Sequence, residues 1–259
     1  MPRLRIIFET EPQSGSRNMA IDEALLENSL ITGDAVLRWY RWSEPTLSLG
    51  YFQNSADLDP AHASLPLVRR LSGGGAILHH HEWTYSCTLP PSHPLTGNPH
   101  DLYVLIHETV IETLSRYNFQ TALRGSSDRE APPLADDQPD PFLCFQRGDP
   151  CDILCGRHKI LGSAQRRRRG AVLQHGSLIL RTSPFAPHIP GLFDLSGISP
   201  DELDLARTLS VTVAENLLYP PQIDELSPAE LDLAQKLYLS RYSEKIDWNR
   251  QSPGQNSLS

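Results

Sequence analysis

The sequence predicts an α+β fold in which mixed or antiparallel β-sheets are flanked by helices. Short strand-like segments, rich in β-branched and aromatic residues, gather before residue 90 and again from 152 to 180. Helical segments lie between and after them, without the strand–helix alternation of a doubly wound parallel sheet. A chain of 259 residues that is 39% hydrophobic can bury one substantial core. We therefore expect a single domain over residues 1–248 and a disordered tail over 249–259.

The first half of the chain is expected to form most of the strands and two helices. Apolar spacing predicts a helix over residues 16–31, with Ser16 as its N-cap. A second amphipathic helix is expected over residues 99–117, with proline at its start. The predicted strands lie at 3–9, 36–42, 46–52, 65–72, 75–80 and 83–90, with a glycine run as a tight turn between two of them.

The second half begins with a polar, Pro/Asp-rich stretch, residues 124–141, which has no apolar periodicity and is expected to be a mobile loop. Strand-like sequence returns at 152–165 and 170–180, joined by "RRRRG" as a predicted hairpin. Helices are expected over residues 200–217 and 227–242. No internal repeat is visible.

Charge and hydropathy exclude several classes of function. A formal net charge of −8 argues against a general nucleic-acid binder, whose surface is usually basic. No apolar run approaches the roughly 18 residues that a membrane helix needs. The N-terminus lacks the apolar core of a signal peptide, since acidic residues interrupt it by Glu9. We therefore expect a cytoplasmic protein that binds neither nucleic acid nor membrane.

Three consecutive glycines, Gly73–Gly75, allow positive φ angles and a close backbone approach to a ligand. No Gly-Lys-Ser/Thr follows them, so they are not a Walker A loop, and a strand rather than a helix comes next, which excludes a Rossmann fingerprint. Taken alone, the run predicts a tight turn. Arg69 and Arg70 before it offer fork-shaped donors to a carboxylate or phosphate.

The three histidines after the glycine run, His79–His81, do not predict a metal site. Side chains alternate faces on a strand, so at most His79 and His81 point the same way. We expect one of the three to be buried or to face a site, and the other two to be solvated.

The four cysteines, Cys87, Cys144, Cys151 and Cys155, are too few for a disulfide scaffold in a chain of this length. The spacing from Cys144 through Cys151 to Cys155 does not fit paired zinc knuckles. Cys151 and Cys155 are expected in one strand, facing one side as small hydrophobes. Cys144 stands at the end of the polar stretch, near the basic cluster Arg157–Lys159, and neighbouring cations favour the reactive thiolate. By composition alone, Lys159 is an ordinary surface lysine.

Three segments together resemble the lipoate-protein ligase and octanoyltransferase family: "NMAIDEALL", "RRLSGGGAILH" and "DILCGRHKILGSAQRRRRGAVLQHGSLIL". The resemblance runs from about residue 16 to 250. It implies the catalytic fold that this family shares with biotin-protein ligases, which is similar to class II aminoacyl-tRNA synthetases.

The family holds two chemistries. Ligases activate a free carboxylate with ATP, whereas octanoyltransferases start from a thioester, so that a cysteine can take the acyl group without a nucleotide. The pair Cys144-Phe145 and the segments "HEWTYS" and "LYLSRYSEKIDWNR" are similar to the cysteine-dependent transferase branch. The unbroken "SGGG" is more similar to the ligases. Three functions therefore stay open: an octanoyltransferase, an ATP-dependent lipoate ligase, and a non-catalytic module that binds lipoyl or acyl proteins.

The transferase reading implies Cys144 as nucleophile and Lys159 as the group that holds the acyl carbonyl. Its implied partners are octanoyl-acyl carrier protein as donor, and as acceptors the lipoyl domains of 2-oxoacid dehydrogenases and glycine cleavage H protein. It needs no cofactor and no metal; ATP and magnesium enter only in the ligase reading. The implied substrate-binding residues are Arg70, Ser72, Gly73, Gly74, Gly75, His79, Gly162, Ser163, Ala164, His175 and Gly176.

The run Arg166–Arg169 has two readings. Charge runs usually form a solvated face, here the tip of a hairpin. The partners implied by the resemblance are acidic, however, and a basic patch on an acidic chain could steer their encounter.

Overall fold

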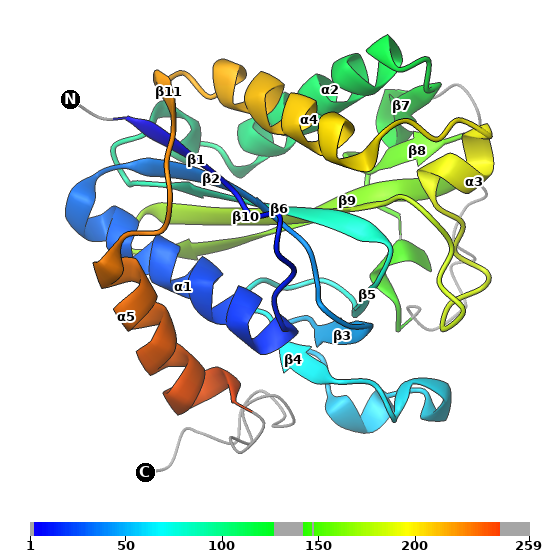
Figure 1. Ribbon diagram of the computed structural model, residues 1–259, viewed down its shortest axis with the longest axis horizontal. Coiled ribbons are helices and arrows are strands. Elements are labelled where there is room, and N and C mark those ends of the chain that lie inside the picture. The colour runs from blue at the N-terminus through cyan, green and yellow to red at the C-terminus, as the bar shows by residue number, and fades with distance from the viewer. Residues whose placement is uncertain (1–2, 127–141, 147, 244–259) are drawn as a thin grey trace.

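Two β-sheets form the framework of the computed structural model, which describes residues 3–126, 142–146 and 148–243 (Figure 1). The larger sheet has the strand order β11-β1-β2-β6-β10-β9-β8-β7, and the smaller has the order β4-β3-β5. The strands are β1 (Leu4–Phe8), β2 (Ala35–Tyr40), β3 (Thr46–Leu49), β4 (Leu67–Arg69), β5 (Ile77–His79), β6 (Glu82–Leu89), β7 (Thr121–Leu123), β8 (Ile153–Cys155), β9 (His158–Arg168), β10 (Ala171–Ile179) and β11 (Pro221–Ile223).

Helices cover both faces of the larger sheet (Figure 1). Helices α2 and α4 pack on one face, whereas α1, α5 and the smaller sheet lie on the other. Every residue of the central strands β6 and β10 is consequently buried. The helices are α1 (Gly15–Thr32), α2 (Pro99–Arg116), α3 (Leu192–Ser196), α4 (Glu202–Asn216) and α5 (Pro228–Leu237). Parallel and antiparallel pairs both occur in the larger sheet, as the predicted mixed α+β architecture requires.

Helix α1 begins two residues earlier than its sequence suggests. Its N-cap is Ser14, whose side chain accepts a hydrogen bond from the backbone N–H of Arg17. The prediction of Ser16 as N-cap was therefore wrong. Gly15 occupies the first helical position because a Cβ there would lie 2.7 Å from the ring of Trp42. Close packing of Gly15 against Trp42 and Thr46 thus fixes the start of the helix.

The predicted hairpin at "RRRRG" is confirmed. Strands β9 and β10 pair antiparallel, and Arg169 and Gly170 between them have φ angles of 50° and 86°. A two-residue turn with both φ angles positive matches the twist of the strands. The segment 152–165 is not one strand, however, because a turn at Gly156 (φ 62°) separates β8 from β9.

The C-terminal helices lie close to their expected positions. The predicted helix over 227–242 is α5 followed by a π-helical turn, Tyr238–Tyr242.

Three short elements were not predicted from the sequence: strands β7 and β11 and helix α3, each of five residues or fewer. The segment 127–141, within the expected mobile loop, and the expected tail over 249–259 both lie outside the described residues.

Buried ion pairs tie the last elements to the first. Arg5 in β1 donates to both carboxylate oxygens of Glu230, at 2.5 and 2.9 Å, although 225 residues separate them. Glu230 also caps its own helix with Ser227. A second buried carboxylate, that of Glu23 in α1, pairs with Arg241 and accepts a hydrogen bond from Tyr242.

In the part of the chain that the structure describes, no helix combines the length and the apolar character needed to cross a membrane.

Candidate active site

Cys144 is held against the glycine run by backbone hydrogen bonds. It begins a single 3₁₀ turn, and its N–H donates to the carbonyl oxygen of Ala76 at 2.7 Å. The N–H of Ala76 donates in turn to Phe142 at 2.9 Å. Leu143 thus forms a parallel β-bridge with Ala76, the residue after Gly75. The half-buried Cys144 thiol therefore takes its position from the glycine run Gly73–Gly75, called the glycine loop below, through Ala76.

Lys159 in β9 reaches the same place from the larger sheet. Its Nζ lies 3.7 Å from Cys144 Sγ and 3.4 Å from the Cys144 carbonyl oxygen. It also forms a 2.8 Å ion pair with the buried carboxylate of Asp152. Lys159 is only 7% exposed, so it is not the surface lysine that composition alone suggests. Burial raises the pKa of Asp152, and the charge of Lys159 opposes that rise.

Gly162 provides the space through which the Lys159 side chain runs. A Cβ at this position would lie 2.6 Å from Lys159 Nζ and 3.2 Å from Asp152 Oδ1. Carbon and nitrogen atoms that do not bond to each other need about 3.5 Å. The absence of a side chain at 162 therefore sets the path of the lysine toward Cys144.

The glycine loop is braced by two buried arginines. Arg70 donates to the carbonyl oxygens of Gly73 and Gly75 at 3.0 and 2.9 Å, and to both oxygens of Ser48. Arg69 donates to carbonyl oxygens of the segment 50–53. Burial lowers the pKa of Arg70 to about 10. These fork-shaped donors thus hold protein backbone, rather than facing outward to bind a carboxylate or phosphate.

Gly50 and Gly74 form a close backbone contact within this loop. A Cβ at Gly50 would lie 2.9 Å from the carbonyl carbon of Gly74, and closer still to its oxygen. Gly74 itself has a φ angle of 89°. Both positions therefore require glycine, the first for space and the second for conformation.

Ser72 and His175 belong to a buried polar cluster on the α1 side of the sheet. Ser72 Oγ is hydrogen-bonded to His175 Nε2, and His175 Nδ1 lies 3.7 Å from Asp22 Oδ2. Burial lowers the pKa of His175. Burial opposes ionisation of Asp22, but the neighbouring imidazole of His175 and the charge of Arg38 hold its pKa below the ordinary value. Asp22 was missed as a site residue, although it lies within the "NMAIDEALL" motif.

His79 is the buried member of the three histidines, as predicted. It stacks on Trp42 with 3.7 Å between ring centroids, and its Nε2 lies 2.6 Å from Ser48 Oγ. Its Nδ1 donates to Glu82 Oε1 at 2.6 Å. Strand β5 ends at His79, so strict alternation does not continue, and His80 and His81 instead stack on each other at 3.6 Å.

Ser163 lies on the other face of the sheet from His175. Its Oγ is 2.6 Å from Nε2 of His107 in α2 and 2.7 Å from the hydroxyl of Tyr85. Ser163 pairs with Gly176, where a Cβ would lie 2.5 Å from Tyr85. Ala164 pairs with His175 and shares its face. Among the residues expected to bind substrate, Ser163 is thus turned away toward α2, where burial lowers the pKa of His107 to about 4.

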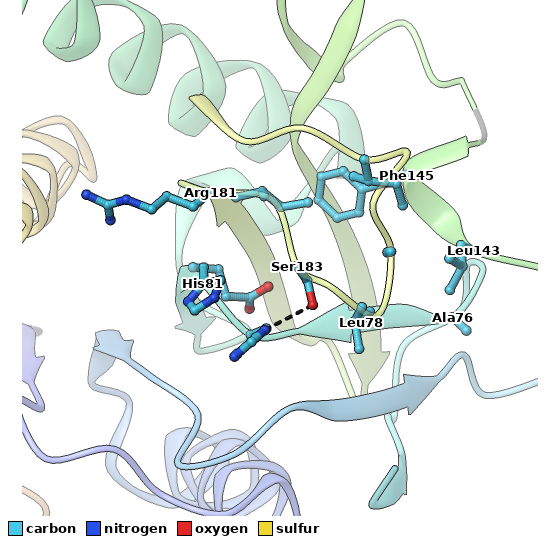
Figure 2. Close-up of a pocket in the computed structure, with 12 residues that line it drawn as sticks. Ala76, Leu78, His81, Leu143, Phe145, Arg181 and Ser183 are labelled. Carbon is cyan, nitrogen blue, oxygen red and sulfur yellow. Dashed lines mark hydrogen bonds between the residues drawn. The ribbon is translucent and has the colours of Figure 1, made fainter. Parts of the chain in front are cut away.

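Two open cavities flank strand β5. Ile77 and His79 line the first and Ala76, Leu78 and His80 line the second; they hold about 230 Å³ and 370 Å³ of empty space, open solvent included. The alternation of side chains along a strand accounts for this division. The first is lined also by Met19, Tyr40, Trp42, Arg70, Thr84, His175, Gly176 and Ser177. Figure 2 shows the second, which reaches Leu143 and Phe145 on either side of Cys144.

Cys151 and Cys155 were predicted to lie in one strand and to face one side, and this prediction was wrong. Cys155 is buried in β8, but Cys151 is half-buried in the turn before that strand, with Sγ 3.6 Å from His100 Nδ1. Burial raises the pKa of the Cys87, Cys151 and Cys155 thiols. Among the residues that the structure places, no group of three His, Cys, Asp or Glu side chains could hold a metal ion.

The arginine run is largely integrated into the fold. Arg168 pairs with Glu23 and Glu27 of α1, and Arg167 donates to the carbonyl oxygen of Thr96 at 2.7 Å. The guanidinium of Arg166 lies 4.9 Å above the ring of Tyr51. Arg169 is exposed at the turn. The run is therefore not a uniform solvated patch.

Comparison with known proteins places this site in a family. Residues 14–188 match the model of the lipoyl protein ligase A/B catalytic domain. The chain belongs to this family. It is 30% identical to octanoyltransferase LipM of Kyrpidia tusciae over 270 residues, covering 94% of this chain and 97% of the relative. It is 36% identical to octanoyltransferase LipM of Symbiobacterium thermophilum over 226 residues, covering 83% and 79%.

Solved structures confirm the predicted fold class. A putative lipoate protein ligase of T. acidophilum with bound lipoic acid superposes with a TM-score of 0.74 at 21% identity, covering 96% of this chain and 99% of the other. The fold is therefore that of the lipoate protein ligases, a mixed α+β fold similar to class II synthetases.

Proposed function

We propose that this protein is a cysteine-dependent octanoyltransferase of lipoate biosynthesis, which moves an octanoyl group through Cys144 to a lysine of a lipoyl protein. The observation that carries the proposal is the 3.7 Å approach of Lys159 Nζ to Cys144 Sγ. An ammonium group at this distance stabilises negative charge on the sulfur, and the thiolate is the nucleophilic form.

The comparisons support transfer over ligation. The two relatives described above carry the name octanoyltransferase, and the first matches nearly the full length of this chain. The likeness to solved ligases is at 21% identity and supports the fold alone. The unbroken glycine run is more similar to ligases, and the structure accounts for glycine at one of its three positions. Gly74 needs its positive φ angle, whereas a Cβ at Gly73 would meet no atom within 4 Å.

In the first half-reaction, the Cys144 thiolate attacks the carbonyl carbon of an octanoyl thioester. A new C–S bond forms, the C–S bond to the donor breaks, and the donor leaves as a thiolate that takes up a proton. Lys159 lies where its ammonium group can donate a hydrogen bond to the developing oxyanion or to the leaving sulfur. In the second half-reaction, a lysine amine displaces the Cys144 sulfur and an amide results.

The cavity beside Trp42 and His175 is suited to the octanoyl tail. Arg70, which donates to the carbonyl oxygen of Gly73, lines this cavity, and Met19, Ile77 and Trp42 supply apolar surface. Burying an octanoyl chain stabilises the complex by roughly 5 kcal/mol at ~0.8 kcal/mol per CH₂ group. This is enough for chain length to affect selection of the acyl group.

A thioester donor is already activated, so the proposal needs neither ATP nor a metal. We infer octanoyl-acyl carrier protein as donor, and lipoyl domains of 2-oxoacid dehydrogenases and glycine cleavage H protein as acceptors. The resemblance implies these macromolecules, whereas the expected cytoplasmic location rests on the N-terminal sequence and the hydropathy of the chain. The chemistry on the chain itself requires only a thioester and an amine.

Mass spectrometry of the intact protein tests the proposal. After incubation with octanoyl-acyl carrier protein and no nucleotide, we expect one octanoyl adduct that maps to Cys144. Cys144→Ser should abolish the thioester adduct, whereas Cys151→Ser, a matched change at the other half-buried cysteine, should leave it intact. Octanoylation of a lipoyl domain that requires ATP and survives Cys144→Ala would instead establish a ligase.

A further inference from the structure

Asp152, the residue before β8, carries a buried carboxylate whose two oxygens have separate partners. Oδ2 accepts a hydrogen bond from the backbone N–H of Asp149 at 2.8 Å and lies 3.7 Å from Nε of Arg124. Oδ1 forms the 2.8 Å ion pair with Lys159 Nζ. The residue is only 3% exposed, and a carboxylate so deeply buried is costly unless it is paired. One oxygen is thus anchored to the chain, and the other holds the lysine.

The backbone of Asp152 is held as firmly as its side chain. Its N–H donates to the carbonyl oxygen of Asp149, and its carbonyl oxygen accepts from the N–H of Arg124, both at 2.9 Å. The carbonyl oxygen of the preceding Cys151 accepts from Nδ1 of His107 at 2.5 Å. The turn that carries Asp152 is therefore tied both to the residue that follows β7 and to helix α2.

A chain of hydrogen bonds on the α2 side supports the same turn. Burial lowers the pKa of His107 to about 4, so its imidazole is neutral at pH 7. Because Nδ1 donates to a carbonyl oxygen, Nε2 accepts from Ser163 Oγ at 2.6 Å. Ser163 accepts in turn from the Tyr85 hydroxyl, and the Tyr85 oxygen accepts from Gln174 Nε2, both at 2.7 Å. Ser163, which lines neither cavity beside β5, thus contributes to the site by supporting the turn before β8.

The Lys159 ammonium group has three N–H bonds, and the structure places three acceptors around it. The contact with Asp152 Oδ1 is 2.8 Å, whereas the carbonyl oxygen and Sγ of Cys144 lie at 3.4 and 3.7 Å. The first distance is that of a charge-assisted hydrogen bond, and the contact with the carbonyl oxygen is long for an N–H donor. Asp152 therefore fixes one N–H bond and leaves the other two directed toward Cys144.

Asp152 is also the counter-ion of this buried lysine. The other titratable groups around the ion pair come from the surrounding segments, and they are Cys144, Arg124, His107 and the exposed Asp149. Of these, Arg124 carries the same charge as Lys159 and His107 is neutral. A buried ammonium group that loses its counter-ion gives up its proton more readily, because burial disfavours the charged form. The Asp152 carboxylate thus affects the charge of Lys159 as well as its position.

We propose that Asp152 is a positioning residue that aims the Lys159 ammonium group at Cys144 and keeps it charged during acyl transfer. The inference rests on the proposed function and adds a residue that acts through Lys159. A lysine side chain is flexible, so its charge is well placed only where neighbouring groups hold it. Asp152 itself neither gains nor loses a proton in either half-reaction.

The single-turnover rate of octanoyl-Cys144 formation from octanoyl-acyl carrier protein, measured against pH, tests this role. For Asp152→Asn we expect a rate about 10²-fold below wild type at neutral pH, and an alkaline decline that begins about one pH unit lower or more. Asp152→Glu keeps the charge but moves the carboxylate by one methylene, so it should lose rate while the alkaline decline stays in place. Asp232→Asn removes the carboxylate of an exposed aspartate–lysine pair on α5, and this matched control should change neither.

A double variant shows whether Asp152 acts through the lysine. In a Lys159→Met background, Asp152→Asn should slow octanoyl-Cys144 formation by less than about threefold, because the group that it positions is gone. Circular dichroism and the melting temperature of each variant establish that it is folded.

Several results would overturn the inference. One is an Asp152→Asn rate equal to that of wild type. Another is a slow Asp152→Asn whose alkaline decline stays at the wild-type pH, or a double variant with fully multiplicative losses, because Asp152 would then only stabilise the turn. If Asp152→Asn does not fold, Asp152→Glu decides, and either an unchanged rate or a second failure to fold counts against the role. Failure of the wild-type protein to form octanoyl-Cys144 would instead refute the proposed function itself.

Discussion

Replacing Gly162 by alanine would show how closely Lys159 must lie to Cys144. The added Cβ would stand 2.6 Å from Lys159 Nζ, where about 3.5 Å is needed, so the ammonium group would shift by roughly 1 Å. Asp152 Oδ1, 3.2 Å from the same Cβ, limits the retreat on its side. A misplacement of ~1 Å in a catalytic group costs on the order of 10²-fold in rate, or about 2.7 kcal/mol at 1.36 kcal/mol per tenfold.

The assay is the single-turnover rate of octanoyl-Cys144 formation from octanoyl-acyl carrier protein. Gly97→Ala is the control, because a Cβ at 97 meets no atom closer than the Pro94 carbonyl oxygen at 3.7 Å. We expect Gly162→Ala to lose about 10²-fold and Gly97→Ala to lose nothing. If the clash acts through the lysine, adding Gly162→Ala to Lys159→Met should cost little more. A Gly162→Ala rate within threefold of wild type, or fully multiplicative losses in the double variant, would refute the reasoning.

Three further predictions concern stability and partner binding. Glu230→Ala should lower the free energy of unfolding by about 3–5 kcal/mol in a urea titration, because it leaves Arg5 buried without its main partner; a loss below 1 kcal/mol would contradict this. The pKa of His107 is about 4 in the folded protein, against 6.5 for an ordinary histidine. The unfolded chain therefore binds more protons between pH 6.5 and 4, so stability falls by about 3 kcal/mol as the pH drops through that window, and His107→Gln should remove this part of the slope. Arg168→Gln should destabilise the protein without altering the salt dependence of transfer, whereas Arg169→Gln should flatten the salt dependence at unchanged melting temperature; the reverse pattern would refute these assignments.

The elements that the sequence predicts well are those with a local physical cause. The β9–β10 hairpin was predicted because Gly170 follows the arginines at the turn, and such turns need positive φ angles. Strand alternation limited the histidines that could share a face to His79 and His81, and the family resemblance indicated His79, which is the buried one. Cys144 and Lys159 were paired through the family resemblance, and the structure brings them to 3.7 Å.

The features that sequence reasoning missed depend on contacts between distant segments. Arg168 looks solvated in the sequence because its partners, Glu23 and Glu27, lie more than 140 residues away. Ser14 rather than Ser16 caps α1 because Gly15 must pack against Trp42, which no local pattern reveals. Buried carboxylates give no compositional signal, so Asp22 went unnoticed.

The contact between Gly50 and Gly74 makes the glycine motif discontinuous in sequence. If positions 50 and 72–76 were randomised together and active variants selected, glycine should return at 50 as strictly as at 74, although 50 lies outside the visible run. The reason is mechanical, since a side chain at 50 would push the loop off Arg70 and carry Ala76 away from Cys144. A motif search that required this fourth glycine would therefore describe the loop more completely than the triplet alone.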